Sequence, residues 1–196
     1  MTFKSKNYKL KMNQILRNQL LPGSIERKRI KKLIFLSFSL FLFMASNADA
    51  DVTLILNSGD WSAVQSVRSG TPPDLCAASG AISLSFAFML VFKNSGQTEV
   101  WLVDPDWHMQ HAVSGVINIK IDNQKIALPV VSNAPQIVAA AVPDQQVKNF
   151  IHTLEGGHSL VVNFGQFQSE AIPLIGAAAV LRATLGCASQ FNINGN

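Results

Sequence analysis

The sequence predicts that residues 51–196 fold as a β-rich α+β domain, an antiparallel sheet or sandwich of six to eight short strands with two helices near the C-terminus. Three observations predict this class. Short apolar runs alternate with small or polar residues between turn signals, which is typical of half-buried strands. Apolar residues at helical spacing occur only late in the chain, after Pro143 and after Gly176. Low charge and many aliphatic residues exclude a disordered chain.

In the first half of the domain, the sequence predicts strands at residues 52–57 and 61–68. A turn-rich loop at 69–73 follows them and leads to Cys76. The clearest strand is expected at residues 82–92, because a large apolar residue occupies every second position. Met89 and Val91 break the alternation, which predicts a partly covered second face near the end of that strand. Further strands are expected at residues 98–103, 116–122, 125–131 and 136–142.

The last part of the domain contains both predicted helices. Asp144 is expected to cap a helix whose apolar residues recur at helical spacing as far as Leu154. The glycine pair at 156–157 is expected to end it. Strands are predicted at 159–164 and 167–173, and the Ala-rich residues 176–186 predict a second helix that ends beside Cys187.

The first fifty residues predict an export leader that lies outside the domain. Residues 27–32 are densely cationic, residues 33–45 form an apolar h-region, and Ala48 and Ala50 occupy the positions that a signal peptidase reads. As a helix the h-region spans about 20 Å, which is too short for a bilayer core of about 30 Å. We therefore expect a signal peptide in residues 1–50, cleaved after Ala50, and a single periplasmic or secreted domain without a transmembrane span. An uncleaved anchor is the alternative.

Removal of the leader reverses the sign of the charge. The whole chain has a formal net charge of +4, whereas residues 51–196 contain six basic and ten acidic residues, a net charge of −4. The basic residues of the domain are scattered singly along the sequence: Arg68, Lys93, Lys120, Lys125, Lys148 and Arg182. This pattern lacks the basic stripe of a nucleic-acid-binding protein, so no nucleic-acid partner is expected.

Cys76 and Cys187 are the two cysteines of the chain, and both lie in the part that we expect to be exported. Two cysteines in an oxidising compartment usually form a disulfide. We therefore expect a Cys76–Cys187 bond that ties the end of the domain to the start of its sheet. Two unrelated buried thiols are the alternative.

Residues 104–111 are the most suggestive candidate site. Two carboxylates and two imidazoles, which could bind zinc or another divalent ion, occur within eight residues: Asp104, Asp106, His108 and His111. However, neighbouring side chains on a turn or strand point apart. A polar turn with exposed histidines is therefore the favoured interpretation, and a metal site is the alternative.

Other catalytic and cofactor patterns are missing from the sequence. It contains no G-x-S-x-G, H-E-x-x-H, G-x-G-x-x-G or P-loop motif, although a Ser-His-Asp arrangement around His152 or His158 stays open. The tryptophans Trp61, Trp101 and Trp107 are expected to pack against the core, with sugar binding as the alternative. We therefore expect no catalytic residues, no cofactor and no bound metal.

The end of the chain, from Phe167 to Cys187, together with Trp61 followed by Cys76 at the front, resembles small exported proteins of Gram-negative bacteria related to the invasion-associated locus B family. The likeness covers most of residues 60–190 and rests chiefly on the spacing G-x-x-A-x-L-x-x-x-x-x-C. This spacing is made by Gly176, Ala179, Leu181 and Cys187. The resemblance implies a β-sandwich with a late helix, structural cysteines and no enzyme activity.

Together these features indicate an exported, non-catalytic protein that binds another protein or an envelope component. An inhibitor of a secreted hydrolase such as a cationic lysozyme is one alternative, because the acidic domain would attract a basic partner. A metal-binding protein centred on residues 104–111 is the other.

We predict that the exported protein begins at Asp51, directly after the small residues that a signal peptidase reads. N-terminal sequencing of protein from the periplasmic or culture fraction measures this. The variant Ala50→Leu, which places a large residue at the cleavage site, is expected to keep its leader. A native first residue upstream of Leu33 would identify the leader as an anchor.

Overall fold

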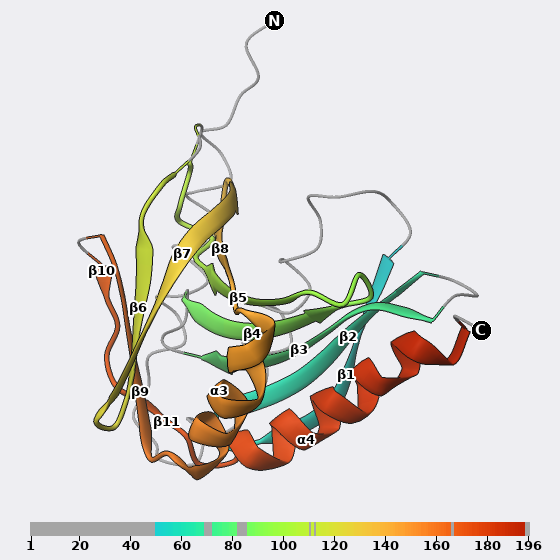
Figure 1. Ribbon diagram of the computed structural model, residues 1–196. Helices are drawn as coiled ribbons and strands as arrows, with labels where there is room; N and C mark the ends of the chain where they lie inside the picture. The colour runs from blue at the N-terminus through green and yellow to red at the C-terminus, as the bar shows by residue number, and fades with distance from the viewer. Residues whose placement is uncertain are drawn as a thin grey trace, which may run out of the picture. The chain divides into compact units, whose positions relative to one another are not determined.

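An antiparallel sheet of eleven strands dominates the described part of the chain, in the order β1-β2-β3-β4-β5-β8-β7-β6-β9-β10, with β11 also paired to β9 (Figure 1). The computed structural model describes residues 50–68, 72–81, 86–109, 111, 113–165 and 167–194, all of which belong to one compact unit. The strands are β1 Ala50–Ser58, β2 Trp61–Arg68, β3 Pro73–Ala81, β4 Ala87–Lys93, β5 Thr98–Val103, β6 Val116–Ile121, β7 Gln124–Ala134, β8 Ile137–Ala141, β9 Ser159–Phe164, β10 Phe167–Gln168 and β11 Ile172–Pro173.

Strand β7 joins the two halves of this sheet. Its first part pairs with β6 as far as Pro129, and its second part, from Val130 onward, pairs with β8. The register shifts between Val130 and Ser132, and proline, which cannot donate to a ladder, lies where pairing with β6 ends. The meander β1–β5 with β8 therefore forms one half of the sheet, and β6, β9, β10 and β11 form the other (Figure 1).

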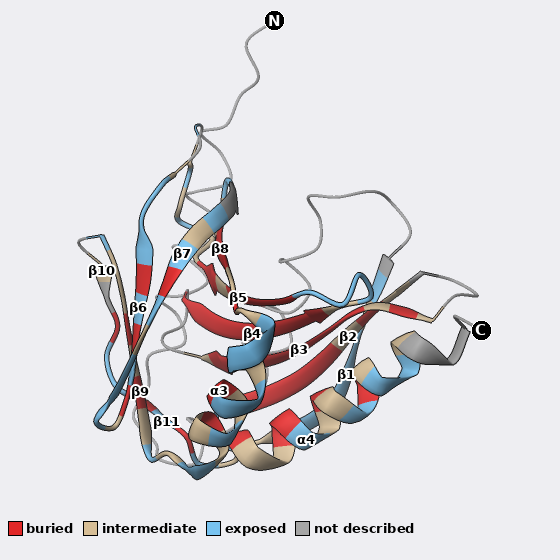
Figure 2. Cartoon of the chain, in the orientation of Figure 1, coloured by how far each residue is buried: buried red, intermediate tan, exposed pale blue. Residues whose placement is uncertain are grey.

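Two helices pack on the same side of the sheet as the main core. Helix α4 (Ala177–Ala188), which continues as the 3₁₀ helix η1 (Ser189–Asn194), crosses β1, β2 and β3, and it also contacts α3 (Asp144–Gly156). The core is made of large side chains from both halves of the sheet and from both helices, as the buried segments of Figure 2 show. Its members include Phe88, Leu90, Leu102, Ile117, Ile119, Ile121, Leu128, Phe150, Leu154, Leu160, Val180 and Leu181.

Trp61 connects the meander to the start of α4. Its indole is fully buried, packs edge-on against Phe88 with 6.2 Å between ring centroids, and donates from Nε1 to the Pro173 carbonyl at 2.9 Å. The ring lies on Gly80, where a Cβ atom would come within 2.9 Å of it. Gly176, with φ of 91°, lies against the backbone of Ser58 at a position that leaves no room for a side chain.

The structure confirms the β-rich α+β class and the antiparallel sheet, but the expected number of strands was too low. The largest difference is β3, because residues 69–73 were expected to be a loop leading to Cys76, with no strand between residues 68 and 82. Residues 76–81 read Cys-Ala-Ala-Ser-Gly-Ala, and small residues carry little strand propensity. They nevertheless form a strand, and their small side chains leave room for the Trp61 ring and for α4, which both pack on β3.

Smaller differences concern the ends of elements. Residues 167–173 form two separate short strands, between which the Ser169 hydroxyl accepts a hydrogen bond from the Val162 amide at 2.8 Å. Asp144 is the first helical residue of α3, and Pro143 holds the N-cap position. Residues 82–85 of the expected strand and residues 1–49 of the expected leader lie outside the described residues.

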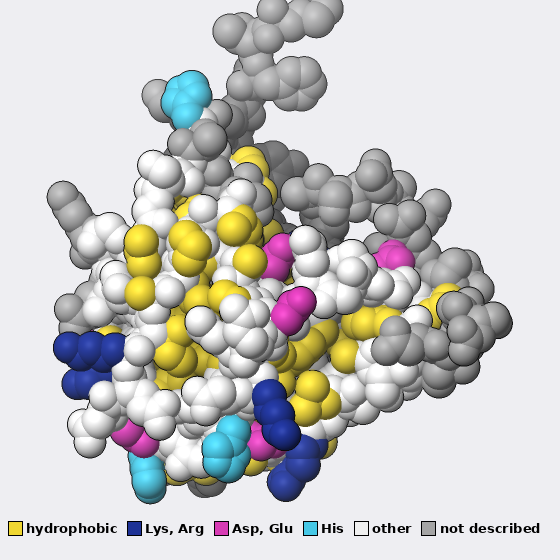
Figure 3. Space-filling view, viewed as in Figure 1, with side chains coloured by type: hydrophobic (Ala, Val, Ile, Leu, Met, Phe, Trp, Pro, Cys, Tyr) yellow, Lys and Arg dark blue, Asp and Glu magenta, His cyan; other side chains and the backbone are white. Residues whose placement is uncertain are grey.

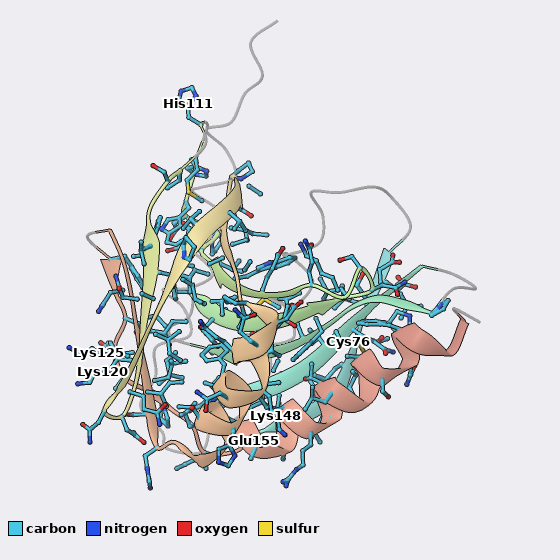
Figure 4. All side chains as sticks on the ribbon, viewed as in Figure 1. Cys76, His111, Lys120, Lys125, Lys148 and Glu155 are labelled. Carbon is cyan, nitrogen blue, oxygen red and sulfur yellow. A yellow bond between two sulfur atoms is a disulfide. The ribbon has the colours of Figure 1, made fainter. Side chains whose placement is uncertain are left out.

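Neither α3 nor α4, the two α-helices that the structure describes, is long and apolar enough to cross a bilayer. The expected disulfide is confirmed. Cys76 of β3 and Cys187 of α4 are bonded, with 6.1 Å between their Cα atoms (Figure 4). The bond holds α4 across β3 at the end away from Trp61.

We predict that Cys187→Ser lowers the free energy of unfolding by about 4–5 kcal/mol, because the disulfide constrains an unfolded chain over a separation of 111 residues. In a domain of this size the loss corresponds to more than about 10 °C in melting temperature, which circular dichroism measures. The double variant with Cys76→Ser serves as the control, because reductant is expected to leave its melting temperature unchanged. Two thiols that react before reduction in exported protein would contradict the bond.

Candidate functional site

The expected polar turn at residues 104–111 is held by its own backbone. The Asp104 carboxylate accepts a hydrogen bond from the Asp106 amide at 2.8 Å, and the Asp104 amide donates to the Gln136 carbonyl at 3.0 Å. The Gln136 side chain donates to the Pro105 carbonyl at 3.1 Å. These bonds anchor the turn to the β7–β8 hairpin, and they use Asp104 as a structural residue.

The two histidines of this segment lie on its surface. His108 and His111 are both exposed, and Figure 4 shows His111 at the tip of the loop that precedes β6. Among the residues that the structure describes, no group of three or more His, Cys, Asp or Glu could hold a metal ion. The geometry therefore gives no support to the metal-binding alternative centred on Asp104, Asp106, His108 and His111.

Asp122, His158 and Ser159 are brought together at the junction between α3 and β9. The Asp122 carboxylate accepts hydrogen bonds from the amides of His158 and Ser159 at 3.0 and 3.1 Å. Its two oxygens also lie 3.4 Å from the His158 Nδ1 and 3.3 Å from the Ser159 Oγ. A catalytic triad needs the imidazole between the hydroxyl and the carboxylate. Here the carboxylate occupies the middle position, so the arrangement is a structural clamp on the start of β9.

The hydrogen bond from the His158 amide is the largest cause that lowers the pKa of Asp122 below its usual value of 3.8. Asp122 itself has a φ of 49°, a left-handed conformation that Asp tolerates in a tight hairpin turn. The carboxylate therefore links the β6–β7 turn to the chain that leaves α3.

Two of the basic residues are closer together than their sequence positions indicate. Lys120 and Lys125 are directly opposite each other in the β6–β7 ladder, and Figure 4 shows both at this hairpin. In the space-filling view of Figure 3, basic side chains gather in two separate places, with no continuous patch between them. These two residues, although separate in the sequence, therefore form a pair across the sheet.

The most unusual surface belongs to the meander, on the side opposite α4. Because Cys76 bonds to Cys187 of α4, alternation along β3 directs Ala77 away from the helix. We call the side chains of β2–β5 and β8 that point away from α4 the outer face. It consists of rows of paired residues: Ser62, Ser79, Met89, Trp101 and Ala139; Val64, Ala77, Val91, Glu99 and Ala141; Ala87, Val103 and Ile137; and Ser66, Leu75 and Lys93.

The outer face is apolar, and it is buried in the full-length chain. Val64, Met89 and Val103 are 4%, 2% and 1% exposed, and Ala77 and Val91 are fully buried. In Figure 2, strands β3 and β4 are buried along both faces, whereas β6 alternates between buried and exposed residues. The half of the sheet that contains β6 thus has the usual solvent-exposed outer surface, whereas the half that contains β3 and β4 does not.

The described helices do not account for this burial. The outer-face residues form a hydrophobic cluster separate from the main core, and the partly buried residues packed on it, Val52, Trp101 and Ile137, belong to the same sheet. Both described helices contact the opposite side. One layer of a sheet cannot by itself cover side chains that point out from it, so the outer face requires a covering layer.

A charged network lies within the outer face. Glu99 is only 5% exposed, and it accepts hydrogen bonds at 2.6 Å from both the Lys93 ammonium and the Trp101 indole. The same ammonium lies 5.6 Å from the centroid of the Trp101 ring. A buried carboxylate is tolerated only when it is paired and hydrogen-bonded, and both Glu99 oxygens meet that condition.

One polar group of the outer face has no partner. The Ser62 side chain is fully buried, and within the described structure its Oγ makes no hydrogen bond. Such orphaned hydroxyls are uncommon in native proteins, because burial without a partner costs free energy. Ser62 is therefore a position at which a covering layer could supply a hydrogen bond.

No pattern in the sequence marks the outer face as a site. The available signal was the break in alternation at Met89 and Val91, which predicted a partly covered second face for one strand only. The neighbouring strand β3 was missed, so the rows that extend across the sheet could not be assembled.

The remaining aromatic cluster belongs to the core. Trp107 lies within 6.3 Å, centroid to centroid, of the rings of Phe86, Phe164 and Phe167. Phe86 and Phe167 stack at 4.1 Å, which favours the packing role that was expected for Trp107.

Comparison with protein-family models, with curated proteins and with solved structures finds no match for this chain.

We predict that Asp122→Asn reduces the loss of stability in acid. The folded pKa of Asp122 is below its unfolded value, so the carboxylate contributes stability above pH 3.8 that is lost as the pH falls through the lower folded pKa. The melting temperature of the native protein is therefore expected to fall more steeply with acidification than that of the variant. Glu170→Gln removes an exposed carboxylate and is the matched control. Parallel curves for the native protein and Asp122→Asn would contradict the clamp.

Proposed function

We propose that this protein is an exported, non-catalytic binding protein of the cell envelope, and that it binds through the outer face of β2–β5 and β8. The observation that carries the proposal is the burial of both faces of the meander, although both described helices pack on the same one. In this proposal, a partner molecule packs on the outer face of the exported protein. Extended apolar surfaces rimmed by polar residues mark sites of interaction.

The composition of the outer face supports a protein-binding role. Trp and Met are enriched in protein interfaces, and Trp101 and Met89 are cross-strand neighbours on the outer face. The Lys93–Glu99 ion pair adds polar groups to the outer face but no net charge. Such a pair favours specific recognition over non-specific electrostatic binding.

Export is the second part of the proposal. A basic segment, an apolar h-region and two small residues at the cleavage site support a signal peptide in residues 1–50. The Cys76–Cys187 bond is consistent with an oxidising compartment such as the periplasm or the extracellular space. Membership of the invasion-associated locus B proteins remains part of this proposal, and it rests on the segment that ends at Cys187.

The clusters described above support binding better than catalysis. Asp122, His158 and Ser159 converge at one place in the described structure, and their order is wrong for nucleophilic attack. Absence of a cofactor and of a bound metal stays a prediction.

Inhibition of a secreted cationic hydrolase is the second candidate function, favoured by the net charge of −4 on residues 51–196. The two candidates differ in their response to salt. Association steered by net charge weakens as ionic strength rises, whereas association through an apolar face does not. A lysozyme that is inhibited in low salt and released in high salt would support the inhibitor.

We predict that a photo-crosslinking residue at Ser79 captures a molecule in cells that export the protein, because Ser79 lies in one of the two middle rows of the outer face. The same residue at Asn118, on the exposed side of β6, is the matched control. Adducts are measured by mass after denaturing electrophoresis. Equal capture from both positions, or none from Ser79, would contradict binding through the outer face.

A further inference from the structure

Strand β1 is a long free edge of the sheet. Among the described residues it pairs with β2 alone, whereas the opposite edge is made of the two-residue strands β10 and β11. Very short strands, and a proline such as Pro173, are features that keep a sheet edge from pairing with another chain. With nine residues at about 3.4 Å each, β1 instead presents an edge about 30 Å long.

The side chains of β1 do not protect this edge either. Leu54, Ile55 and Leu56 are 51%, 40% and 36% exposed in the full-length chain, so three large apolar residues lie consecutively on the surface. The strand contains no Lys, Arg or Pro, and Asp51 at its start is its one charged residue. A long apolar edge with so little charge is a template for pairing with another strand.

The one protective feature of β1 is a bulge. The register with β2 shifts between Leu54 and Leu56, which leaves Ile55 as the extra residue. A bulge can twist an edge away from other chains, but here the bulged side chain is itself exposed. Beyond the β1–β2 turn the apolar surface continues, because the Ile175 backbone lies against Gly59 and the Ile175 side chain is 79% exposed.

The pattern of β1 is complementary to itself. Its apolar middle, residues 54–56, lies between an acidic end at Asp51 and an uncharged polar end at Asn57 and Ser58. Antiparallel pairing of two β1 strands would place one apolar middle against the other, and each Asp51 beside the polar end of the other copy. Parallel pairing would bring the two carboxylates together, which is destabilising. A patch that matches itself in this way is what a two-fold interface requires.

We propose that two copies of this chain associate through antiparallel β1 strands, so that their sheets join into one continuous sheet across a two-fold axis. This interface uses a different surface from the outer face and does not depend on the proposed function. A contact of one strand from each copy is narrower than a standard interface, in which each partner buries about 800 Å². We therefore expect a reversible dimer whose population rises with protein concentration.

Hydrogen–deuterium exchange tests this interface without any substitution. Unpaired backbone amides of an edge strand exchange readily with solvent, and a second strand paired with them slows that exchange. In protein purified from the cells that make it, raising the concentration is expected to shift the mass measured by sedimentation from one chain to two. The same rise is expected to slow exchange in residues 50–58 and to leave exchange in residues 167–173, at the opposite edge, unchanged.

Two bulge residues give the matched variants. Ile55→Lys puts a charge at the centre of the interface, and it is expected to raise the dissociation constant of the dimer on the order of 10-fold or more. Val131 is 54% exposed and is the extra residue where the register of β7 shifts against β8, but β7 is an internal strand. Val131→Lys is therefore expected to leave the dissociation constant unchanged. Circular dichroism checks that each variant folds. If Ile55→Lys does not fold, the exchange measurement on the native protein decides.

Three results would overturn the inference. They are a single-chain mass at every concentration, a dimer whose formation leaves exchange in residues 50–58 unchanged, and a dimer that Val131→Lys weakens as much as Ile55→Lys. A chain that stays monomeric while another envelope protein slows exchange in residues 50–58 would also overturn it, because the edge would then accept a strand of a different protein. The crosslink at Ser79 tests the outer face separately, so the two proposals can fail independently.

Discussion

The close approach of helix α4 to strands β2 and β3 is the constraint on which the rest of the structure depends. Trp61 can lie flat on β3 only because Gly80 has no side chain, and the turn before α4 can reach the β1–β2 hairpin only because Gly176 has none. The Cys76–Cys187 bond then holds the far end of the same helix. Because successive side chains of a strand point to opposite faces, a helix that packs on one face of β1–β3 leaves every second residue directed to the other face.

The elements that sequence reasoning predicted well are those whose large side chains carry the pattern. The isoleucines of β6 alternate with polar residues, and the structure buries each isoleucine. The disulfide followed from cysteine number and compartment. Strand β3 was missed for the opposite reason, because its small residues carry no periodic signal. Their role depends on what packs above them, namely Trp61 and α4, and a local pattern does not contain that information.

The candidate sites show the same limit. Asp104, Asp106, His108 and His111 are near in sequence, but the turn uses the Asp104 carboxylate as a hydrogen-bond acceptor and leaves the other three side chains exposed. Glu99 and Ser62 belong to no sequence motif, so no functional role was predicted for them. They become notable only when cross-strand pairing places them within a buried apolar layer. A site whose residues come together through the register of several strands cannot be predicted from the spacing of residues along a single strand.

Ala50 is both the residue after which cleavage is expected and the first residue of β1, where it pairs with Arg68. A peptide bond that is already hydrogen-bonded into a sheet is poorly available to a protease, which acts on locally opened chain. Cleavage after Ala50, if the leader is processed as proposed, and closure of the β1–β2 hairpin would therefore compete for the same few residues. Cleavage would then have to come before the hairpin closes, so the timing of folding would decide whether the leader is removed.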